Sequence, residues 1–263
     1  MAKVIVITSG KGGVGKTTTT ANLGVGLALQ GKKTLLIDAD IGLRNLDVVM
    51  GLENRIVYDL VDVIDGHCRI RQALIKDKRC DNLFLLPAAQ TKDKNSVNPE
   101  QMKTLIEALK VDFDFIIIDC PAGIEQGFKN AIAAADQALI VTTPEISAVR
   151  DADRIIGLLD AHEIKDSKLI VNRIKVDMVR EGNMLDISDI VDILAVDVMG
   201  IIPDDENIII STNKGEPLIF KGSSMAARAY SNISQRVIGN EVSFLELPSR
   251  GGIFNKLRGI FKR

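Results

Sequence analysis

Residues 3–20, KVIVITSGKGGVGKTTTT, predict a strand, a glycine-rich loop and the start of a helix. The apolar run Lys3–Thr8 is typical of a buried strand, and the segment from Lys16 to Gln30 has the apolar spacing of a helix. Between them, Gly10–Thr17 fits the pattern G-x-x-x-x-G-K-[ST], in which successive backbone N–H groups turn inward around phosphate oxygens. Because strand, loop and helix follow one another as this mechanism requires, the stretch predicts a nucleoside triphosphate site.

The loop residues have separate expected roles. Lys16 reaches the β- and γ-phosphates, and the hydroxyl of Thr17 ligates Mg²⁺. The residues expected to contact the nucleotide here are Gly10, Lys11, Gly12, Gly13, Val14, Gly15, Lys16, Thr17 and Thr18. Lys11 is one lysine more than a phosphate cradle needs, and by itself it is typical of a solvated loop lysine.

Apolar runs typical of strands alternate with helical patterns along the rest of the chain. The strand runs are 34–38, 83–87, 114–119, 138–143, 168–172 and 198–203. The helical patterns lie near 16–30, 99–110, 124–135, 146–161 and 223–238. Strands that are apolar throughout are buried on both faces, so we expect an α/β fold with three layers and a mostly parallel sheet flanked by helices. This domain is expected over 1–239, with a linker over 240–252.

Composition narrows the classes of protein. At 263 residues the chain suits one α/β domain, and its 33 basic and 35 acidic residues give no overall charge that would favour nonspecific nucleic-acid binding. No run approaches the ~20 apolar residues of a membrane span, and the N-terminal run is too short for a signal peptide. We therefore expect a soluble or peripheral protein.

The cysteines do not indicate a metal centre. Cys68, Cys80 and Cys120 form no C-x-x-C pair, and the chain has only His67 and His162 beside them. This pattern favours reduced thiols in a cytosolic protein over a metal or iron–sulfur site.

Two further strand runs end in carboxylates. Asp38 and Asp40 close LLIDAD (35–40), and Asp119 closes DFIIID (114–119). Ligands of a parallel α/β sheet gather at the carboxyl ends of its strands. A single aspartate there is often a turn or helix cap, but three beside a phosphate loop predict a Mg·ATP site. Asp119 is similar to a Walker-B aspartate that holds Mg²⁺, and of Asp38 and Asp40 one can serve the metal while the other orients the attacking water.

Five segments in order carry a family resemblance: KGGVGKTTT (11–19), LLIDADIGLRNLD (35–47), IIIDCPAGIE (116–125), VTTPEISAVRDADR (141–154) and GEP (215–217). They resemble the septum-site-determining ATPases of the deviant Walker-A (ParA/MinD) P-loop family. The resemblance covers nearly the whole chain, including its last ten residues. It implies a homodimer formed with ATP, in which Lys11 reaches the phosphates bound by the other subunit. A cation supplied in trans makes charge stabilisation depend on association, as an arginine finger does.

The resemblance also implies roles for the carboxylates. Asp40 would position the hydrolytic water and Asp38 would lie close to Mg²⁺, both in switch I. Asp119 and the segment 121–123 would form switch II. Lys11, Lys16 and Asp40 are then the expected catalytic residues, and Thr17, Asp38 and Asp119 the expected metal-binding residues.

Other matching positions imply a base site and partner surfaces. Asn172 is similar to an asparagine that recognises the adenine edge, and Pro203 and Asp204 resemble an adenine-flanking loop. Each of these could equally be a capping or turn residue. The segments 149–154 and 42–45 resemble surfaces that contact partner proteins, although an exposed charged helix face would look the same.

The C-terminal segment GGIFNKLRGIFKR (251–263) predicts a second activity. On a helix of 100° per residue, its large apolar side chains lie in one arc of about 120°. They are Ile253, Phe254, Leu257, Ile260 and Phe261. No acidic residue follows Glu246, so the polar face is cationic. This pattern favours an amphipathic helix over 253–263 on anionic membrane lipid, and the alternative is a helix packed on the protein's own core.

Together these features predict a cytoplasmic ATPase, slow and partner-stimulated, that is peripheral on the inner face of the cytoplasmic membrane in its ATP form. The resemblance implies that it recruits a MinC-like septum inhibitor and is stimulated by a MinE-like factor. A flagellar-number regulator would share both loop and tail and is the first alternative. A DNA-partition ATPase would need a basic surface cluster without an apolar stripe, so no specific nucleic acid is expected. A reductase or iron–sulfur carrier of the same fold is disfavoured by the cysteine spacing.

Overall fold

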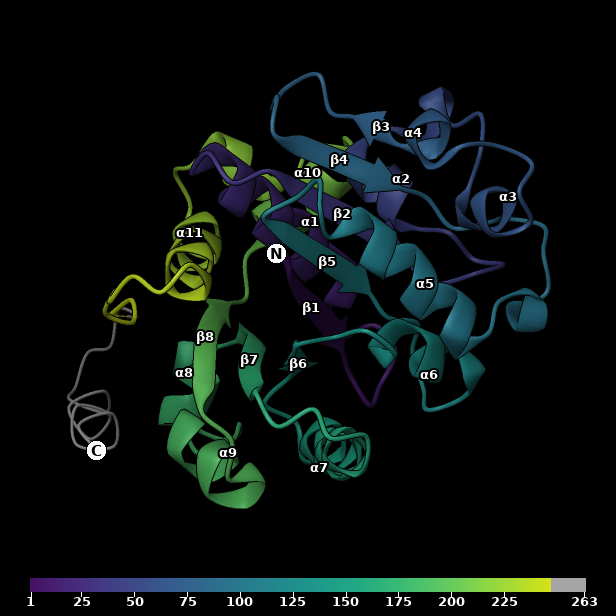
Figure 1. The fold of residues 1–263 in the computed structure, drawn as a ribbon. Helices are drawn as coiled ribbons and strands as arrows, with labels where there is room; N and C mark the ends of the chain where they lie inside the picture. Colours follow the sequence, from purple (N-terminus) through teal and green to yellow (C-terminus); the bar gives the residue numbers. More distant parts are fainter. Residues whose placement is uncertain (247–263) are drawn as a thin grey trace.

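The computed structural model describes residues 1–246, and within them eight strands form a single sheet (Figure 1). The strands are β1 (Lys3–Thr8), β2 (Thr34–Asp38), β3 (Ile75–Lys76), β4 (Leu83–Leu86), β5 (Phe115–Asp119), β6 (Gln137–Thr142), β7 (Ser167–Ile174) and β8 (Val198–Pro203). Their spatial order is β3-β4-β2-β5-β1-β6-β7-β8. Every neighbouring pair is parallel except β3 with β4, which is antiparallel. The expected mostly parallel sheet is confirmed.

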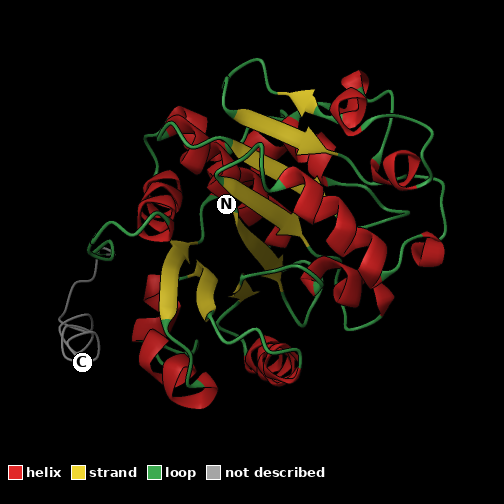
Figure 2. Ribbon diagram, viewed as in Figure 1, coloured by secondary structure: helices red, strands yellow, loops and turns green. Residues whose placement is uncertain are grey.

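Helices cover both faces of this sheet (Figure 2). The longer ones are α1 (Lys16–Leu29), α5 (Pro99–Leu109), α6 (Gln126–Ile132), α7 (Ile146–Ala161), α9 (Ile187–Leu194), α10 (Glu206–Asn213) and α11 (Met225–Val237). The short ones are α2 (Leu46–Met50), α3 (Leu60–Ile64), α4 (Ile70–Ala73) and α8 (Val176–Arg180). Three 3₁₀ turns lie at Glu53–Arg55, Lys94–Ser96 and Leu218–Lys221.

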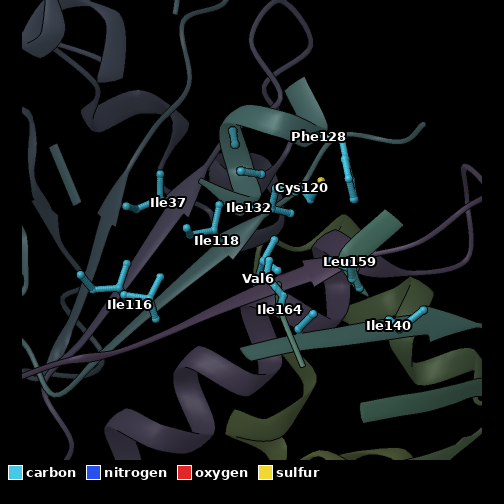
Figure 3. Packing of buried hydrophobic residues seen from close by; sticks show 14 of the residues in the cluster. Val6, Ile37, Ile116, Ile118, Cys120, Phe128, Ile132, Ile140, Leu159 and Ile164 are labelled. Atoms are coloured by element: carbon cyan, nitrogen blue, oxygen red, sulfur yellow. The ribbon is translucent and has the colours of Figure 1, made fainter. Parts of the chain in front are cut away.

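The sheet is the middle of the three layers, and a hydrophobic core lies on each of its faces, because alternate strand residues point to opposite faces. In β1, Val4 and Val6 enter one core and Ile5 and Ile7 enter the other. Helices α5, α6, α7 and α9 pack into the first core, and α1, α2 and α11 pack into the second. Figure 3 shows part of the first core, in which Val6 and Ile118 lie near Ile132.

The strand order brings three loops together at one edge. Neighbours β2, β5 and β1 run in the same direction, so their carboxyl ends are adjacent. The segment Gly10–Thr17 forms the loop after β1 and the first two residues of α1, the loop after β2 contains Asp40, and β5 ends at Asp119. Because Asp38 pairs with Asp119 across β2 and β5, two predicted site carboxylates are direct neighbours.

The sequence pattern does not predict β3, α2, α3, α4, α8, α9 or α10. Periodicity is informative over windows of about 11–18 residues, and each of these elements is shorter. The starts of α3, α9 and α10 are set by side-chain caps instead. Asp186 begins α9, for example, by accepting a hydrogen bond from the backbone N–H of Asp189 at 2.8 Å.

The described chain after α11 is irregular but held against the domain. Arg236 donates from Nε to the carbonyl of Val242 at 2.9 Å and from Nη2 to the carbonyl of Ser243 at 2.9 Å. Its guanidinium lies 4.1 Å from the ring centroid of Phe244. The domain boundary near Gly239 and the linker over 240–252 stay predictions.

The predicted amphipathic helix lies outside the described residues, together with Ile253, Phe254, Leu257, Ile260 and Phe261. Among the helices of residues 1–246, none is both long and apolar enough to cross a membrane.

Arg79 joins three segments on the α2 side of the sheet. Its guanidinium contacts both carboxylate oxygens of Asp77, at 3.0 and 2.6 Å. It also donates to the carbonyls of Met50 at 2.6 Å and Gly215 at 2.8 Å. Arg79 thus connects the β3–β4 turn to the end of α2 and to the GEP segment.

We expect Arg79→Ala to lower the free energy of unfolding by about 2 kcal/mol. The Asp77 carboxylate is only 1% exposed, so removal of its cation leaves a buried charge. Such losses reach about 3–5 kcal/mol when both partners are buried, and the 32% exposure of the Arg79 side chain reduces the expected cost. Urea unfolding of this variant beside Lys78→Ala, an exposed neighbour, measures the effect. Equal midpoints for the two variants would contradict it.

Candidate nucleotide site

The phosphate loop ends at the uncapped N-terminus of α1. Gly15 precedes the helix with φ 101°, a left-handed conformation that favours glycine, and no side chain caps the first turn. A methyl group at Gly10 would collide with the backbone of Asp151 on α7, so the loop also starts against a neighbouring helix. The first-turn N–H groups of α1 are therefore available to an anion, which the helix dipole also favours.

Lys16 and Thr17, at the start of α1, lie close to Asp119 at the end of β5. Lys16 is only 8% exposed, and Asp119 is 3% exposed at the end of β5. Burial raises the pKa of Asp119 to about 6, against the lowering effects of a hydrogen bond from Thr17 and the charge of Lys16. Thr20 also donates from Oγ1 to Asp119 Oδ1 at 3.2 Å. The predicted association of loop lysine, loop hydroxyl and Walker-B carboxylate is therefore present.

Asp38 is fully buried, and its carboxylate accepts hydrogen bonds from three backbone N–H groups. Its Oδ1 accepts from the backbone N–H of Asp40 at 2.9 Å, and its Oδ2 accepts from those of Asn45 and Leu46 at 3.1 and 3.0 Å. Burial and the neighbouring charge of Asp119 raise the pKa of Asp38 to about 7. The carboxylate thus fixes the loop after β2 and the start of α2. A metal ion bound to Asp38 would share its carboxylate oxygens with these three backbone N–H groups.

Asp40 lies at the same edge with a half-buried side chain. Burial raises the pKa of its carboxyl, and the charges of Lys94 and Lys16 oppose that rise. Asp40 is therefore close enough to Lys16 to interact with it electrostatically, beside the place where the loop would hold the terminal phosphate.

Lys11 points away from its own loop. Its Nζ donates to Ser147 Oγ at 3.1 Å and lies 3.6 Å from Glu145 Oε2, at the start of α7. The Lys11 side chain is 44% exposed. The extra lysine is thus on the outer rim of the site and is joined to α7 by weak, accessible contacts.

A cavity of about 1160 Å³ extends from the loop toward β7 and β8. Gly15 and Thr18 line its phosphate end, and Asn172 and Asp204 line it further along. Pro203, the last residue of β8, is buried. The cavity is large enough for a nucleotide. Of the predicted nucleotide residues, Gly15, Thr18, Asn172 and Asp204 line it, whereas Lys16, Thr17 and Pro203 do not.

The donors present fit Mg²⁺ with a nucleotide. Within residues 1–246 no group of three or more His, Cys, Asp or Glu side chains is placed to hold a metal ion. Mg²⁺ commonly takes one or two carboxylates, phosphate oxygens and water, so it needs no such group. Thr17 and Asp119 supply hard oxygen donors, with Asp38 adjacent. Cys120 lies beside Asp119, and burial raises the pKa of its thiol to about 12, which leaves it neutral.

The two expected partner surfaces are accessible. Leu43 in segment 42–45 is an exposed apolar residue, and Arg150, Asp153 and Arg154 are exposed along α7. The loop 42–45 follows Asp40 directly, so one of these surfaces adjoins the nucleotide site.

Several contributors to the site are not predicted by the sequence pattern. Thr20 was not distinguished within the run of threonines, although it lies one helical turn after Lys16 and therefore on the same face. Ser147, Glu145 and Lys94 come from segments distant in sequence, and no local pattern identifies them.

Comparison with known proteins places the chain in a family. A family model described as an AAA domain matches residues 2–172. The septum site-determining protein MinD of Bacillus subtilis (strain 168) is 56% identical over 264 residues, which cover 99% of this chain and 98% of that protein.

Two solved structures are similar as well. The MinC:MinD cell division protein complex of Aquifex aeolicus has a chain with 50% identity and a TM-score of 0.88, covering 93% of this chain and 99% of that one. The septum site-determining protein MinD complexed with Mg-ADP from Pyrococcus horikoshii OT3 has 32% identity and a TM-score of 0.82. The match covers 91% of this chain and 97% of that chain. With these identities over nearly its whole length, the chain belongs to the MinD family of septum site-determining P-loop ATPases.

Proposed function

We propose that this protein hydrolyses ATP slowly, dimerises in its ATP form, and in that form acts at the membrane in division-site placement. The observation that carries the proposal is the separation of two lysines. Lys16 is buried in the loop, whereas Lys11 lies exposed on the rim and contacts α7. A lysine held this weakly can leave α7 and contact phosphates bound by a second copy of the chain.

The residues of the site have distinct roles in this proposal. The loop amides and Lys16 hold the β- and γ-phosphates, and Thr17 and Asp119 would hold Mg²⁺, with Asp38 nearby. Bound Mg²⁺ would neutralise charge on the phosphate oxygens. The Asp40 carboxylate accepts a hydrogen bond from the attacking water and orients it toward the γ-phosphate. Water and ATP give ADP and phosphate, and Lys11 of a second copy stabilises the charge that develops.

Partner contacts are proposed for the surfaces that adjoin the site. One similar structure is a MinC:MinD complex, which supports a MinC-like septum inhibitor as a partner of this chain. Loop 42–45 and the exposed side of α7 are accessible to it. A MinE-like stimulating factor is proposed on the family relationship alone. The fold is shared with partition proteins, but no observation on this chain favours DNA binding.

Membrane binding is proposed for the C-terminal segment. Five large apolar side chains contribute at most ~1.5–3 kcal/mol each when fully buried, and each cation adds ~1 kcal/mol near an anionic surface. Ordering about ten residues opposes this by ~1–2 kcal/mol each. One tail should therefore bind weakly. Two tails on one dimer can raise avidity by ~10²–10⁴-fold, so membrane binding should follow ATP through dimerisation.

Co-sedimentation with vesicles that contain anionic lipid tests the whole proposal. The ATP form should bind the vesicles and the ADP form should remain in the supernatant. Duplex DNA in place of vesicles provides the control for a partition ATPase. Equal vesicle affinity of the two nucleotide forms, or ATP-dependent binding to DNA alone, would contradict the proposal.

Ile260→Glu should abolish vesicle binding, with a loss of at least about tenfold in affinity, because it places a charge within the apolar arc. ATP-driven dimerisation should be unchanged. Asn255→Glu is the matched control, since it makes the same change of charge about 200° round the helix from Ile253, on the polar face. Vesicle co-sedimentation and light scattering measure both properties. Equal losses in the two variants would indicate that net charge, and not the apolar stripe, controls binding.

A further inference from the structure

Asn172 of β7 is bonded directly to the phosphate loop. Its Nδ2 donates to the carbonyl of Val14 at 2.8 Å, and its Oδ1 accepts from the backbone N–H of Arg173 at 2.9 Å. Asn172 and Val14 are each 3% exposed. The two residues are 158 positions apart in sequence, so this contact exists only because β7 lies near the loop.

The contact is also close-packed. Gly15 follows Val14, and a methyl group at Gly15 would collide with Nδ2 of Asn172. The loop backbone therefore passes directly against this amide. Because both amide ends of Asn172 have partners, the side chain is held in one orientation.

The contact between Asn172 and Val14 also sets the direction of the next backbone N–H, that of Gly15. The bond between Val14 and Gly15 is trans, since residues 1–246 contain no cis peptide. In a trans peptide the C=O and the following N–H point in opposite directions within one plane. When Asn172 holds the carbonyl of Val14, the N–H of Gly15 must point the other way, toward the inside of the loop where phosphate oxygens are expected.

We infer that Asn172 is a positioning residue for the phosphate loop, separate from its predicted contact with adenine. It holds the Val14–Gly15 peptide so that the Gly15 N–H faces the phosphates. Asn172 also lines the cavity expected to hold the base, so one side chain serves both ends of the nucleotide. The inference rests on the proposed nucleotide site, and it concerns how that site is held in shape.

A ligand without a base separates the two roles. An asparagine that only recognises adenine has no effect on inorganic triphosphate, whereas one that aims the Gly15 N–H affects triphosphate and ATP alike. Loss of an aligned hydrogen bond from a donor to a charged group corresponds to at least about a tenfold change in affinity.

Isothermal titration of the full chain with Mg·triphosphate and with Mg·ATP tests the inference. Asn172→Asp keeps the shape of the side chain but places an acceptor against the Val14 carbonyl, and Asn172→Ala removes the contact. Both variants should bind inorganic triphosphate at least about tenfold more weakly than the wild type. Asp204→Ala, on the base side of the cavity, is the control, and it should weaken ATP binding while leaving triphosphate binding within about twofold.

Unchanged triphosphate affinity in Asn172→Ala, with weaker ATP binding, would overturn the inference and leave the nucleotide site intact. Equal losses of triphosphate affinity in Asp204→Ala would also overturn it, because the effect would then not be specific to the loop contact. If the wild type bound neither ligand, the proposed function would fail as well. Thermal unfolding of each variant shows whether the compared proteins are folded. If Asn172→Asp does not fold, the test is made with Asn172→Ala alone.

Discussion

Asp40→Ala should reduce ATP hydrolysis by about 100-fold or more while ATP binding and dimerisation persist. Loss of a residue that orients or deprotonates the attacking water typically costs about 10²–10⁴-fold in rate. The phosphate loop does not include Asp40. The hydrogen bond to Asp38 comes from the backbone N–H of Asp40, so alanine retains it and the start of α2 stays in place. The variant should therefore accumulate as an ATP-bound dimer.

Single-turnover hydrolysis, with light scattering for the dimer, measures both parts of this prediction. Asp38→Ala is the contrasting variant, because it removes the acceptor for three backbone N–H groups and should disturb the loop and α2 themselves. Near-normal single-turnover hydrolysis in Asp40→Ala would show that another group orients the water.

Lys11→Ala should leave ATP binding within about threefold of the wild type but prevent the ATP dimer, and hydrolysis should fall by about 10³-fold. Exposed ion pairs contribute at most about 1 kcal/mol, so loss of the contacts with Ser147 and Glu145 should hardly affect folding. The expected loss of rate follows from the size of the arginine-finger effect in related phosphoryl transfers.

Calorimetry of ATP binding and light scattering separate these two steps. Glu145→Gln is the control, since it breaks the ion pair with Lys11 but keeps the lysine, and it should still dimerise. A Lys11→Ala protein that dimerises normally with ATP would show that Lys11 is only a solvated loop residue. If Glu145→Gln also failed to dimerise with ATP, the loss of the dimer would be due to the Lys11–Glu145 contact within one chain.

Much of the fold followed from the sequence because buried parallel strands have a strong local signal. Residues 3–8, 34–38 and 198–203 were predicted as strands with the bounds that the structure has, and 146–161 as a helix. These segments are apolar throughout or have a long helical period, and their burial depends little on which neighbour covers them. The short helices were missed because their ends depend on individual caps and on packing.

Some features of the nucleotide site likewise follow from local sequence patterns, and others depend on the tertiary structure. The sequence by itself determined the phosphate loop, with its glycines, Lys16 and Thr17, and it placed Asp38, Asp40 and Asp119 at strand ends, since spacing and strand pattern are local properties. Only the tertiary structure decided which strands are neighbours.

Strand order put Asp38 beside Asp119, and it brought Lys11 to Ser147 across 136 positions. It also set Asn172 against Val14, across 158 positions. Asp38 illustrates the difference most clearly, because the sequence predicts a carboxylate near the metal, while the fold also makes it the acceptor that holds α2. Contacts of this kind depend on the packing of whole layers against one another, and no local pattern in the sequence records that packing.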